Sequence, residues 1–184
     1  MRSVGAQPAP PKNPSTVVND KLDQILAAIG GIQQSNPTLR WDQNLPAAQR
    51  FVILAAFNNE AVLDRETGLV WEQSPAIAPD NWAAIRIQCT SRTTGGRKGW
   101  RLPSVHELAS LVDPSVAFPG PTLPPGHPFS NNVQSSNYWS ATTDAGGPTD
   151  AWFVNFSNGR VSTDSKAVTH LDWCVRGGMN ADQY

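Results

Sequence analysis

The sequence lacks a long apolar run and lacks an excess of either charge, and both absences restrict where the protein can act. No stretch reaches the roughly 18 consecutive apolar residues of a membrane-spanning helix, and residues 1–30 lack the apolar core of a secretory signal. Lys and Arg total 14 against 15 Asp and Glu, for a formal net charge of −1. We therefore expect no membrane insertion, no nucleic-acid partner and no export signal in the chain as written.

Cysteine is scarce as well, because the chain contains only Cys89 and Cys174. A structural zinc site needs four clustered ligands, whereas the three histidines are scattered singly and neither cysteine belongs to a Cys-x-x-Cys pair. We expect no metal site. The two cysteines are either a disulfide or two buried free thiols. A disulfide closing a loop of this length would stabilise the fold by about 4–5 kcal/mol and would indicate an oxidising compartment.

Glycine, proline and tryptophan are well represented, with 14, 16 and 7 residues among 184. This length fits one domain plus a short appendage, since a domain averages about 150 residues. Residues 1–16 are rich in proline and poor in bulky side chains, which predicts an extended arm. Residues 37–178 are expected to form the globular domain and residues 179–184 a tail.

Residues 17–35 have the spacing of an amphipathic helix. Apolar residues recur every three or four positions, at Val18, Leu22, Ile25, Ile29 and Ile32. Isoleucine along such a seam favours a three-stranded coiled coil, and two heptads are too short to be stable as a lone helix. We therefore predict a homo-oligomer, most simply a trimer. A helix packed on its own domain is the alternative.

The domain combines short strands with two helices, which predicts an α+β fold. The strands are expected at residues 50–57, 61–63, 69–71, 138–142, 151–156, 160–165 and 171–177. Gly68 lies where the hairpin between the second and third strands needs a positive φ. Residues 114–137 contain six prolines and show no periodicity, so they predict a long loop.

The two helices have different start signals. Asp80 or Asn81 is expected to cap the first helix. Its inward face is expected to carry Trp82, Ile85 and Cys89. Ser104 and Glu107 form a capping box, which is the best-specified helix start in the chain.

The last hairpin provides one candidate ligand-binding surface. The Asn158-Gly159 pair predicts a two-residue turn. The cross-strand pairs would then be Ser157 with Arg160, Asn155 with Ser162, and Phe153 with Asp164. Alternation places these side chains on one outward face, and an exposed Phe153 among small polar groups is typical of a binding surface. A Phe153 packed beneath the long proline-rich loop is the alternative. With residues near the strand ends, the candidates are Asp150, Phe153, Asn155, Ser157, Arg160, Ser162, Asp164, Lys166 and His170.

A second candidate surface is basic. Residues 81–106 contain five of the 14 basic side chains and no acidic one. Arginine can hold sulfate, phosphate or carboxylate in a two-pronged hydrogen bond. The candidate anion-binding residues are Arg86, Arg92, Arg97 and Lys98. A basic loop that arose by chance is the alternative.

Several short motifs follow one another in a recognisable order. They are Ala61-Val62-Leu63-Asp64 with Thr67-Gly68-Leu69-Val70-Trp71, the helix from Trp82 to Cys89, Gly99-Trp100-Arg101-Leu102-Pro103 with Glu107-Leu108, Tyr138-Trp139-Ser140-Ala141-Thr142, Ala151-Trp152-Phe153-Val154-Asn155-Phe156 with Gly159, and Cys174-Val175-Arg176. In this order and spacing, residues 50–178 resemble the Lcl C-terminal domain family of the C-type-lectin-like superfamily.

The resemblance implies a C-type-lectin-like α+β domain whose short strands display a ligand face. It also implies a disulfide between Cys89 and Cys174. Formylglycine-generating enzymes and the variable proteins of diversity-generating retroelements belong to the same superfamily. Members of the family occur at the ends of trimeric stalks or collagen-like fibres of bacterial adhesins and phage, and some recognise sulfated polysaccharides.

The chain departs from the catalytic and calcium-binding members of that superfamily. It lacks the Glu-Pro-Asn or Gln-Pro-Asp triplet and the Trp-Asn-Asp triplet of calcium-dependent lectins, and residues 119–128 hold no carboxylate. The implied disulfide would use both cysteines, leaving none for formylglycine chemistry. His106-Glu107 lacks the second histidine of a zinc-protease helix, and no phosphate loop occurs. We expect no enzyme and no cofactor.

These observations lead to a functional hypothesis. The protein would be a recognition module on a short oligomerising stalk, binding a glycan or a cell-surface protein through several weak sites at once. The alternative is a structural or decorating subunit of an extracellular fibre or a phage-like particle. Both hypotheses place the protein outside the cell or on a particle.

Overall fold

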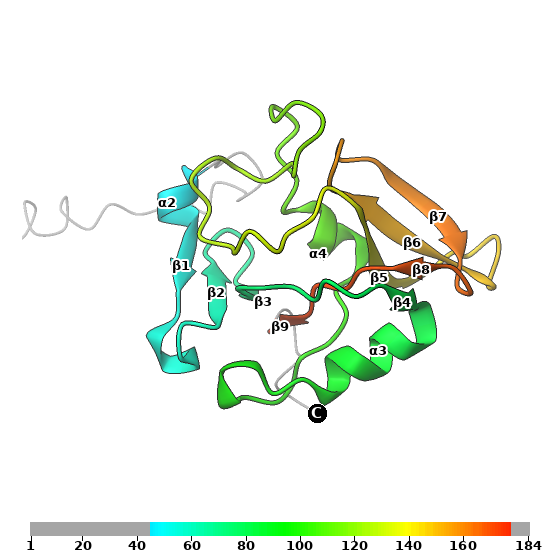
Figure 1. Ribbon diagram of the computed structural model, residues 1–184, viewed down its shortest axis with the longest axis horizontal. Coiled ribbons are helices and arrows are strands. Elements are labelled where there is room, and N and C mark those ends of the chain that lie inside the picture. The colour runs from blue at the N-terminus through cyan, green and yellow to red at the C-terminus, as the bar shows by residue number, and fades with distance from the viewer. Residues whose placement is uncertain (1–44, 178–184) are drawn as a thin grey trace, which may run out of the picture. The chain divides into compact units, whose positions relative to one another are not determined.

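The computed structural model describes residues 45–177 (Figure 1). The predicted arm at 1–16, the predicted helix at 17–35 with its seam from Val18 to Ile32, and the tail at 179–184 lie outside the described residues. The described elements are α2 (Ala47–Arg50), β1 (Phe51–Ile53), η2 (Ala55–Phe57), β2 (Ala61–Asp64), β3 (Val70–Glu72), β4 (Asp80–Asn81), α3 (Trp82–Ser91), η3 (Thr94–Gly96), α4 (Val105–Ala109), β5 (Asn137–Thr143), β6 (Asp150–Asn155), β7 (Val161–Ser165), β8 (Thr169–His170) and β9 (Val175–Arg176). None of these helices has the length and apolar character needed to cross a bilayer.

The strands form small antiparallel sheets, which confirms the mixed α+β fold. One sheet has the order β1-β2-β3-β9, a second pairs β4 with β8, and the third has the order β5-β6-β7. The predicted β2–β3 hairpin is present, and Gly68 in its turn has a φ of +73°. Because β9 pairs with β3, the end of the domain returns to the sheet in which it began.

The predicted start of α3 is confirmed. The Asn81 side chain caps the helix, because its Oδ1 accepts a hydrogen bond from Ala84 N at 3.0 Å. The predicted inward face is buried, with Trp82, Ile85 and Cys89 all packed into the core.

The capping box of α4 is also present. Glu107 N donates to Ser104 Oγ at 3.3 Å, and Ser104 N donates to Glu107 Oε2 at 2.8 Å. Arg101 adds two hydrogen bonds to the same carboxylate, at 2.8 Å and 2.7 Å. Burial raises the pKa of Glu107, but the hydrogen bonds from Arg101 and Ser104 outweigh it and leave the pKa below its ordinary value. This helix start is therefore anchored to the preceding segment.

Two predicted strands are broken in the structure. Of the single strand expected at 50–57, only β1 is extended, because Arg50 ends α2 and residues 55–57 form η2. Asn58 and Asn59 then adopt left-handed conformations that turn the chain toward β2. The strand expected at 171–177 is shortened to β9, and residues 172–174 belong to no strand. There Trp173 Nε1 donates to Glu72 O at 2.8 Å, so the backbone leaves the extended pairing to send this side chain into the core.

Two hydrophobic clusters lie on either side of β6. The first, which we name the Trp173 cluster, includes Trp71, Tyr138, Val154 and Phe156. The second, which we name the disulfide cluster, is made mostly by α3 and the opposite face of the β5–β6 pair. Its members are Ala61, Trp82, Ile85, Cys89, Trp100, Leu102, Trp139, Ala151, Phe153 and Cys174. Successive β6 side chains enter alternate clusters, so both faces of this sheet are covered.

The long loop expected at 114–137 contains neither helix nor strand up to Ser136, where β5 follows. It is nevertheless fixed to the domain. Leu123 and Phe129 are buried in the Trp173 cluster, and Thr122 N donates to Phe156 O at 2.8 Å. The loop therefore serves as a wall of the core.

The β6–β7 hairpin differs from the prediction by two residues. Phe153 lies opposite Ser162, and Asn155 N donates to Arg160 O. Gly159 has a φ of +74° and donates its N–H to Asn155 O, which makes a longer, bulged turn in place of the two-residue turn. Because side chains alternate with a period of two, this shift leaves each residue on the face that was predicted for it.

Candidate functional site

The hairpin residues predicted to bind ligand do not form one open surface. Phe153 is only 8% exposed and His170 only 7%. Both rings pack on Trp139, with centroids 6.3 Å and 4.3 Å from its centroid. The prediction that Phe153 is an exposed aromatic is wrong, because α3 covers the sheet face that alternation had assigned to solvent.

His170 has a single charged neighbour on that face. Its Nε2 lies 3.3 Å from Asp164 Oδ2 without the alignment of a hydrogen bond. Burial lowers the pKa of His170, while the Asp164 carboxylate opposes that shift. Burial thus favours the neutral form of His170, whose ring packs against Trp139 and Phe153.

Asn155 and Ser157 stabilise the hairpin turn. Asn155 Oδ1 accepts hydrogen bonds from Ser157 N at 2.7 Å and from Ser157 Oγ at 2.6 Å. Asn155 Nδ2 donates to Asn137 Oδ1 at 2.7 Å on the neighbouring strand. These interactions use most of the polar groups of the two side chains, so little of their hydrogen-bonding capacity faces a ligand.

The other hairpin candidates have accessible side chains. They are Asp150, Arg160, Ser162, Asp164 and Lys166. Arg160 is exposed, and its Nη2 donates to Ser162 Oγ at 3.2 Å. Their role in ligand binding stays a prediction.

Arg92, one of the residues of the predicted anion-binding patch, is engaged in ion pairs within the domain. The Arg92 guanidinium donates to Asp172 Oδ2 at 3.0 Å, and its Nε lies 3.5 Å from Glu72 Oε1. Its charge therefore neutralises two buried carboxylates of the domain and is not free for a ligand.

The other members of the patch are exposed but do not form one cluster. Arg97 lies over the Phe57 ring, with Cζ 5.7 Å from the centroid. Arg86 lies over a different ring, that of Trp82. Lys98 makes no ion pair within residues 45–177. The sequence cluster is thus divided between the outer side of α3 and the loop after η3.

Arg86 and Lys166 converge on Trp82. Arg86 Cζ lies 4.6 Å and Lys166 Nζ 4.4 Å from the centroid of the indole. The indole is held in place, because its Nε1 donates to Ser140 O at 2.7 Å. Lys166 Nζ is positioned by hydrogen bonds to Thr143 Oγ1 at 3.1 Å and to Pro148 O at 2.6 Å. The fold thus joins one cation from each predicted surface on a single aromatic ring.

A shallow groove runs along α3 beside this ring. It is lined by Trp82, Ala83, Arg86, Ile87 and Thr90. Ile87 is 69% exposed, which is unusual for a large aliphatic side chain. Within residues 45–177 no carboxylate forms an ion pair with either Arg86 or Lys166. We name this surface, together with Lys166, the Trp82 groove. Arg86 lines the groove itself, and Lys166 lies over the same indole without being part of the groove lining. Neither cation has an acidic partner in the described part of the chain.

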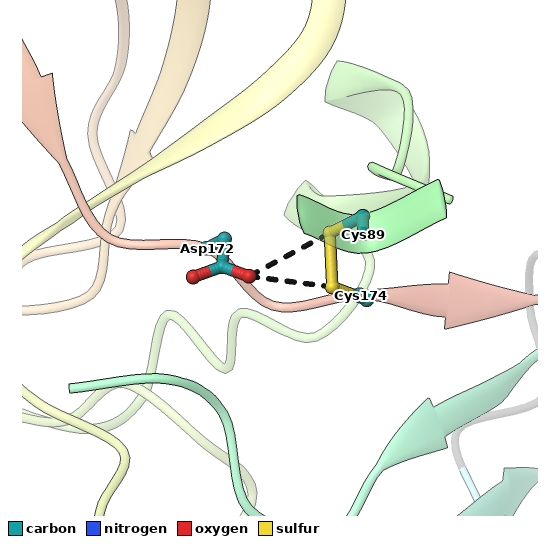
Figure 2. Close-up of side chains that lie close together, drawn as sticks. All are labelled: Cys89, Asp172 and Cys174. Atoms are coloured by element: carbon teal, nitrogen blue, oxygen red, sulfur yellow. Dashed lines mark hydrogen bonds between the residues drawn. A yellow bond between two sulfur atoms is a disulfide. The ribbon is translucent and has the colours of Figure 1, made fainter. Parts of the chain in front are cut away.

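The two cysteines form a disulfide, with Cα atoms 5.4 Å apart. Asp172 lies beside it, with Oδ2 3.3 Å from Cys174 Sγ and 3.6 Å from Cys89 Sγ (Figure 2). The three groups are close enough for a metal ion, but sulfurs bonded to each other are not thiolate ligands. The pKa of Asp172 is raised by burial and is only partly lowered by Arg92. This cluster is therefore structural.

Comparison with known families agrees with this architecture. The profile of the Lcl C-terminal domain matches residues 60–176. The chain belongs to this family. No curated protein matches the chain.

The match to the Lcl C-terminal domain covers the elements that build the site. It begins just before β2 and ends with β9, so it includes α3, the β6–β7 hairpin and both cysteines. It also contains Trp82, Arg86 and Lys166. The candidate site thus lies within the residues that the family profile matches.

Sequence reasoning found the two cations of this Lcl C-terminal domain but missed that they meet. Trp82 and Arg86 are four residues apart on a helix, and this spacing alone predicts that they are neighbours. Lys166 gives no such signal, because only the antiparallel pairing of β4 with β8 brings its segment to the start of α3. There Trp82 N donates to Lys166 O at 3.2 Å.

Proposed function

We propose that this protein is a non-catalytic recognition module that binds an acidic glycan in the Trp82 groove. The observation that carries the proposal is the convergence of Arg86 and Lys166 on one indole, with neither cation in an ion pair within residues 45–177. Two cations held over a rigid aromatic ring have little conformational freedom to lose when they bind an anion. Because neither cation has a carboxylate partner in the described part of the chain, the arrangement favours ligand binding over a purely structural role.

The groove matches a sugar that carries negative groups. Ala83 and Ile87 offer an aliphatic surface for the C–H face of a sugar ring, next to the edge of Trp82. The Arg86 guanidinium can hold a sulfate or carboxylate through paired hydrogen bonds, while Lys166 adds a point charge. A neutral sugar would leave both cations without an oppositely charged partner, so the site favours acidic sugars.

The wider proposal follows from the family and the sequence. A C-type-lectin-like domain at the end of an oligomeric stalk would present several copies of the groove to one polymer. Linking weak sites in this way raises the overall affinity by about 10²–10⁴-fold. A disulfide in the domain supports an oxidising, extracellular or particle-surface setting. A cell-surface protein carrying acidic glycans would be bound by the same chemistry.

The proposal is tested by binding to an immobilised sulfated polysaccharide. Arg86→Ala and Lys166→Ala each remove one cation from the Trp82 groove. Each variant should bind about tenfold more weakly than the parent chain, since charge-assisted hydrogen bonds contribute roughly 1.5–3 kcal/mol. The double variant should elute at a still lower salt concentration.

Arg65→Ala is the matched control. Arg65 is exposed on the β2–β3 turn, so the substitution removes the same charge at a site away from the Trp82 groove. It should bind like the parent. The proposal fails if Arg65→Ala weakens binding as much as Arg86→Ala, or if both groove variants keep the affinity of the parent. Thermal unfolding of all variants verifies that the exposed substitutions leave the fold intact.

A further inference from the structure

The free edge of the β5-β6-β7 sheet is a second surface without a partner. β7 is the outer strand of this sheet, and nothing in the described part of the chain lies beyond it (Figure 1). Exposed strand edges are templates for pairing with another chain. Val161, at one end of β7, is 41% exposed.

The hydrogen-bond pattern identifies which backbone groups of β7 are free. Asn155 N donates to Arg160 O, so Arg160 occupies a position that bonds toward β6. In an antiparallel pair such positions alternate, so Ser162 and Asp164 also bond toward β6. Val161 and Thr163 therefore direct their N–H and C=O groups away from the sheet, toward the open edge.

The side chains of β7 add a charge pattern to this edge. Arg160, Ser162 and Asp164 lie on one face of the strand, with the opposite charges equally far from Ser162 in the sequence. Such an arrangement complements itself when it is turned by 180° about Ser162.

We propose that β7 pairs antiparallel with β7 of a second copy of this chain, with a two-fold axis at Ser162. Val161 of each copy lies opposite Thr163 of the other, and these residues exchange backbone hydrogen bonds. Arg160 of each copy lies opposite Asp164 of the other, so the interface contains two equivalent ion pairs. Two three-stranded sheets become one continuous sheet of six strands.

Electrostatics selects this register over its neighbours. Only registers that place Val161 and Thr163 in hydrogen-bonded positions use the free groups of the edge. Two neighbouring registers also meet this condition. The register centred on Val161 places Arg160 opposite Ser162 and Asp164 opposite Asn158, so it forms no ion pair. The register centred on Thr163 places Arg160 of one copy opposite Lys166 of the other. Like charges directly opposite each other destabilise a strand pair, whereas the Ser162-centred register gains attraction at the same position.

This interface goes beyond the proposed function and does not depend on it. It uses the edge of the sheet, whereas the proposed glycan site lies on α3 and at Lys166. It is also separate from any assembly through residues 17–35. A two-fold contact at β7 would connect two copies side by side and place two recognition surfaces on one sheet.

A cysteine crosslink tests the register directly in the full-length chain. Both native cysteines are bonded to each other, so Ser162→Cys introduces the single free thiol. In the proposed pairing the two Cβ atoms at position 162 lie about 4.5–5.5 Å apart, which suits a disulfide. Mild oxidation should therefore give a covalent dimer on a denaturing gel. Asn158→Cys, at the exposed turn, is the control and should stay largely uncrosslinked.

Charge reversal provides a second test that does not depend on thiols. Arg160→Asp alone, or Asp164→Arg alone, places like charges opposite each other twice and should weaken the dimer about tenfold or more. The double exchange restores both pairs and should restore association, as measured by sedimentation. Equal crosslinking of the two cysteine variants, or a double exchange that associates no better than the single ones, would overturn the proposal. Neither result would bear on glycan binding by the Trp82 groove.

Discussion

Asp172 is a fully buried carboxylate whose only ion pair within residues 45–177 is with Arg92. Its Oδ1 has no hydrogen-bond partner in this part of the chain, and Oδ2 faces the disulfide. Glu72 lies close by, with Oε2 accepting from Cys174 N at 3.1 Å. Two carboxylates therefore share one half-exposed guanidinium. Burial raises the pKa of each of them, and this gives the domain a pH dependence of a definite sign.

The sign follows from proton linkage. The folded state holds a proton on Asp172 more tightly than the unfolded chain does, so protonation favours folding. This stabilisation is complete below about pH 4 and is lost as the pH rises through the raised pKa. In Asp172→Asn the group no longer titrates. The free energy of unfolding of the parent minus that of the variant should therefore fall between about pH 4 and pH 7, as measured by urea unfolding.

Glu72→Gln is the companion variant, because burial raises the pKa of Glu72 in the same direction. The difference between the parent and this variant should also fall as the pH rises. Parallel pH curves for the parent and Asp172→Asn would contradict this, because they would show that folding leaves the pKa of Asp172 unchanged.

The bulged turn between β6 and β7 depends on a glycine for two separate reasons. Gly159 has a φ of +74°, and a Cβ placed on it would lie 2.7 Å from Val112 Cγ1. Gly68, in the β2–β3 turn, has a φ of +73° but nothing within 4 Å of such a Cβ. The two positions therefore have nearly the same positive φ and differ in the space around the missing Cβ.

Gly68→Ala should destabilise the domain by about 1–2 kcal/mol, which is the cost of the left-handed conformation alone. Gly159→Ala should cost about 1–3 kcal/mol more, because Val112 must move to admit the methyl group. Chemical denaturation of the two variants measures the difference. Equal losses would mean that the hairpin turn does not press on the end of α4 as the structure indicates.

The elements that the sequence predicted well are those specified by neighbouring residues. The capping box at Ser104, the Asn81 cap and the turn at Gly68 are each encoded within a few positions. The strand at 171–177 failed because its interruption is caused by Trp173, which bonds to Glu72 from a distant part of the chain. Local patterns do not contain that information.

The candidate site shows the same division. Alternation assigned Phe153 to a separate face from Val154 correctly, but it could not show that both faces are covered. Whether a strand is buried on one face or on both depends on which other elements pack against it. The alternation within the strand does not reveal this. Likewise, Arg86 and Lys166 were recognised as basic candidates, whereas their meeting on Trp82 depends on the pairing of β4 with β8.

Over the whole domain, the last residues pair with a strand from the start of the domain and are also bonded to α3. β9 pairs with β3, and Cys174, just before β9, is bonded to Cys89 on α3. The bridge closes a loop with a sequence separation of 85, which contains α4, the long loop and the whole β5-β6-β7 sheet. Lys166 therefore lies within one covalent ring, whereas Trp82 and Arg86 lie on α3 just before Cys89, where the ring begins.

The disulfide should thus contribute a large share of the total stability. In the chain-entropy model, a closed loop of this size stabilises the folded state by about 4–5 kcal/mol, a large part of the 5–15 kcal/mol typical of a domain. Because both sulfurs are buried, the bridge is reduced in denaturant, and the protein is then refolded with reductant present. The free energies of unfolding of the reduced and oxidised forms, measured with urea, should differ by that amount. Labelling of both thiols should verify complete reduction. The Cys89→Ala, Cys174→Ala double variant should lose at least as much, since it also loses buried side-chain volume. A fully reduced chain that unfolds at the same urea concentration as the oxidised one would mean that packing of the two clusters alone fixes α3 against the end of the domain.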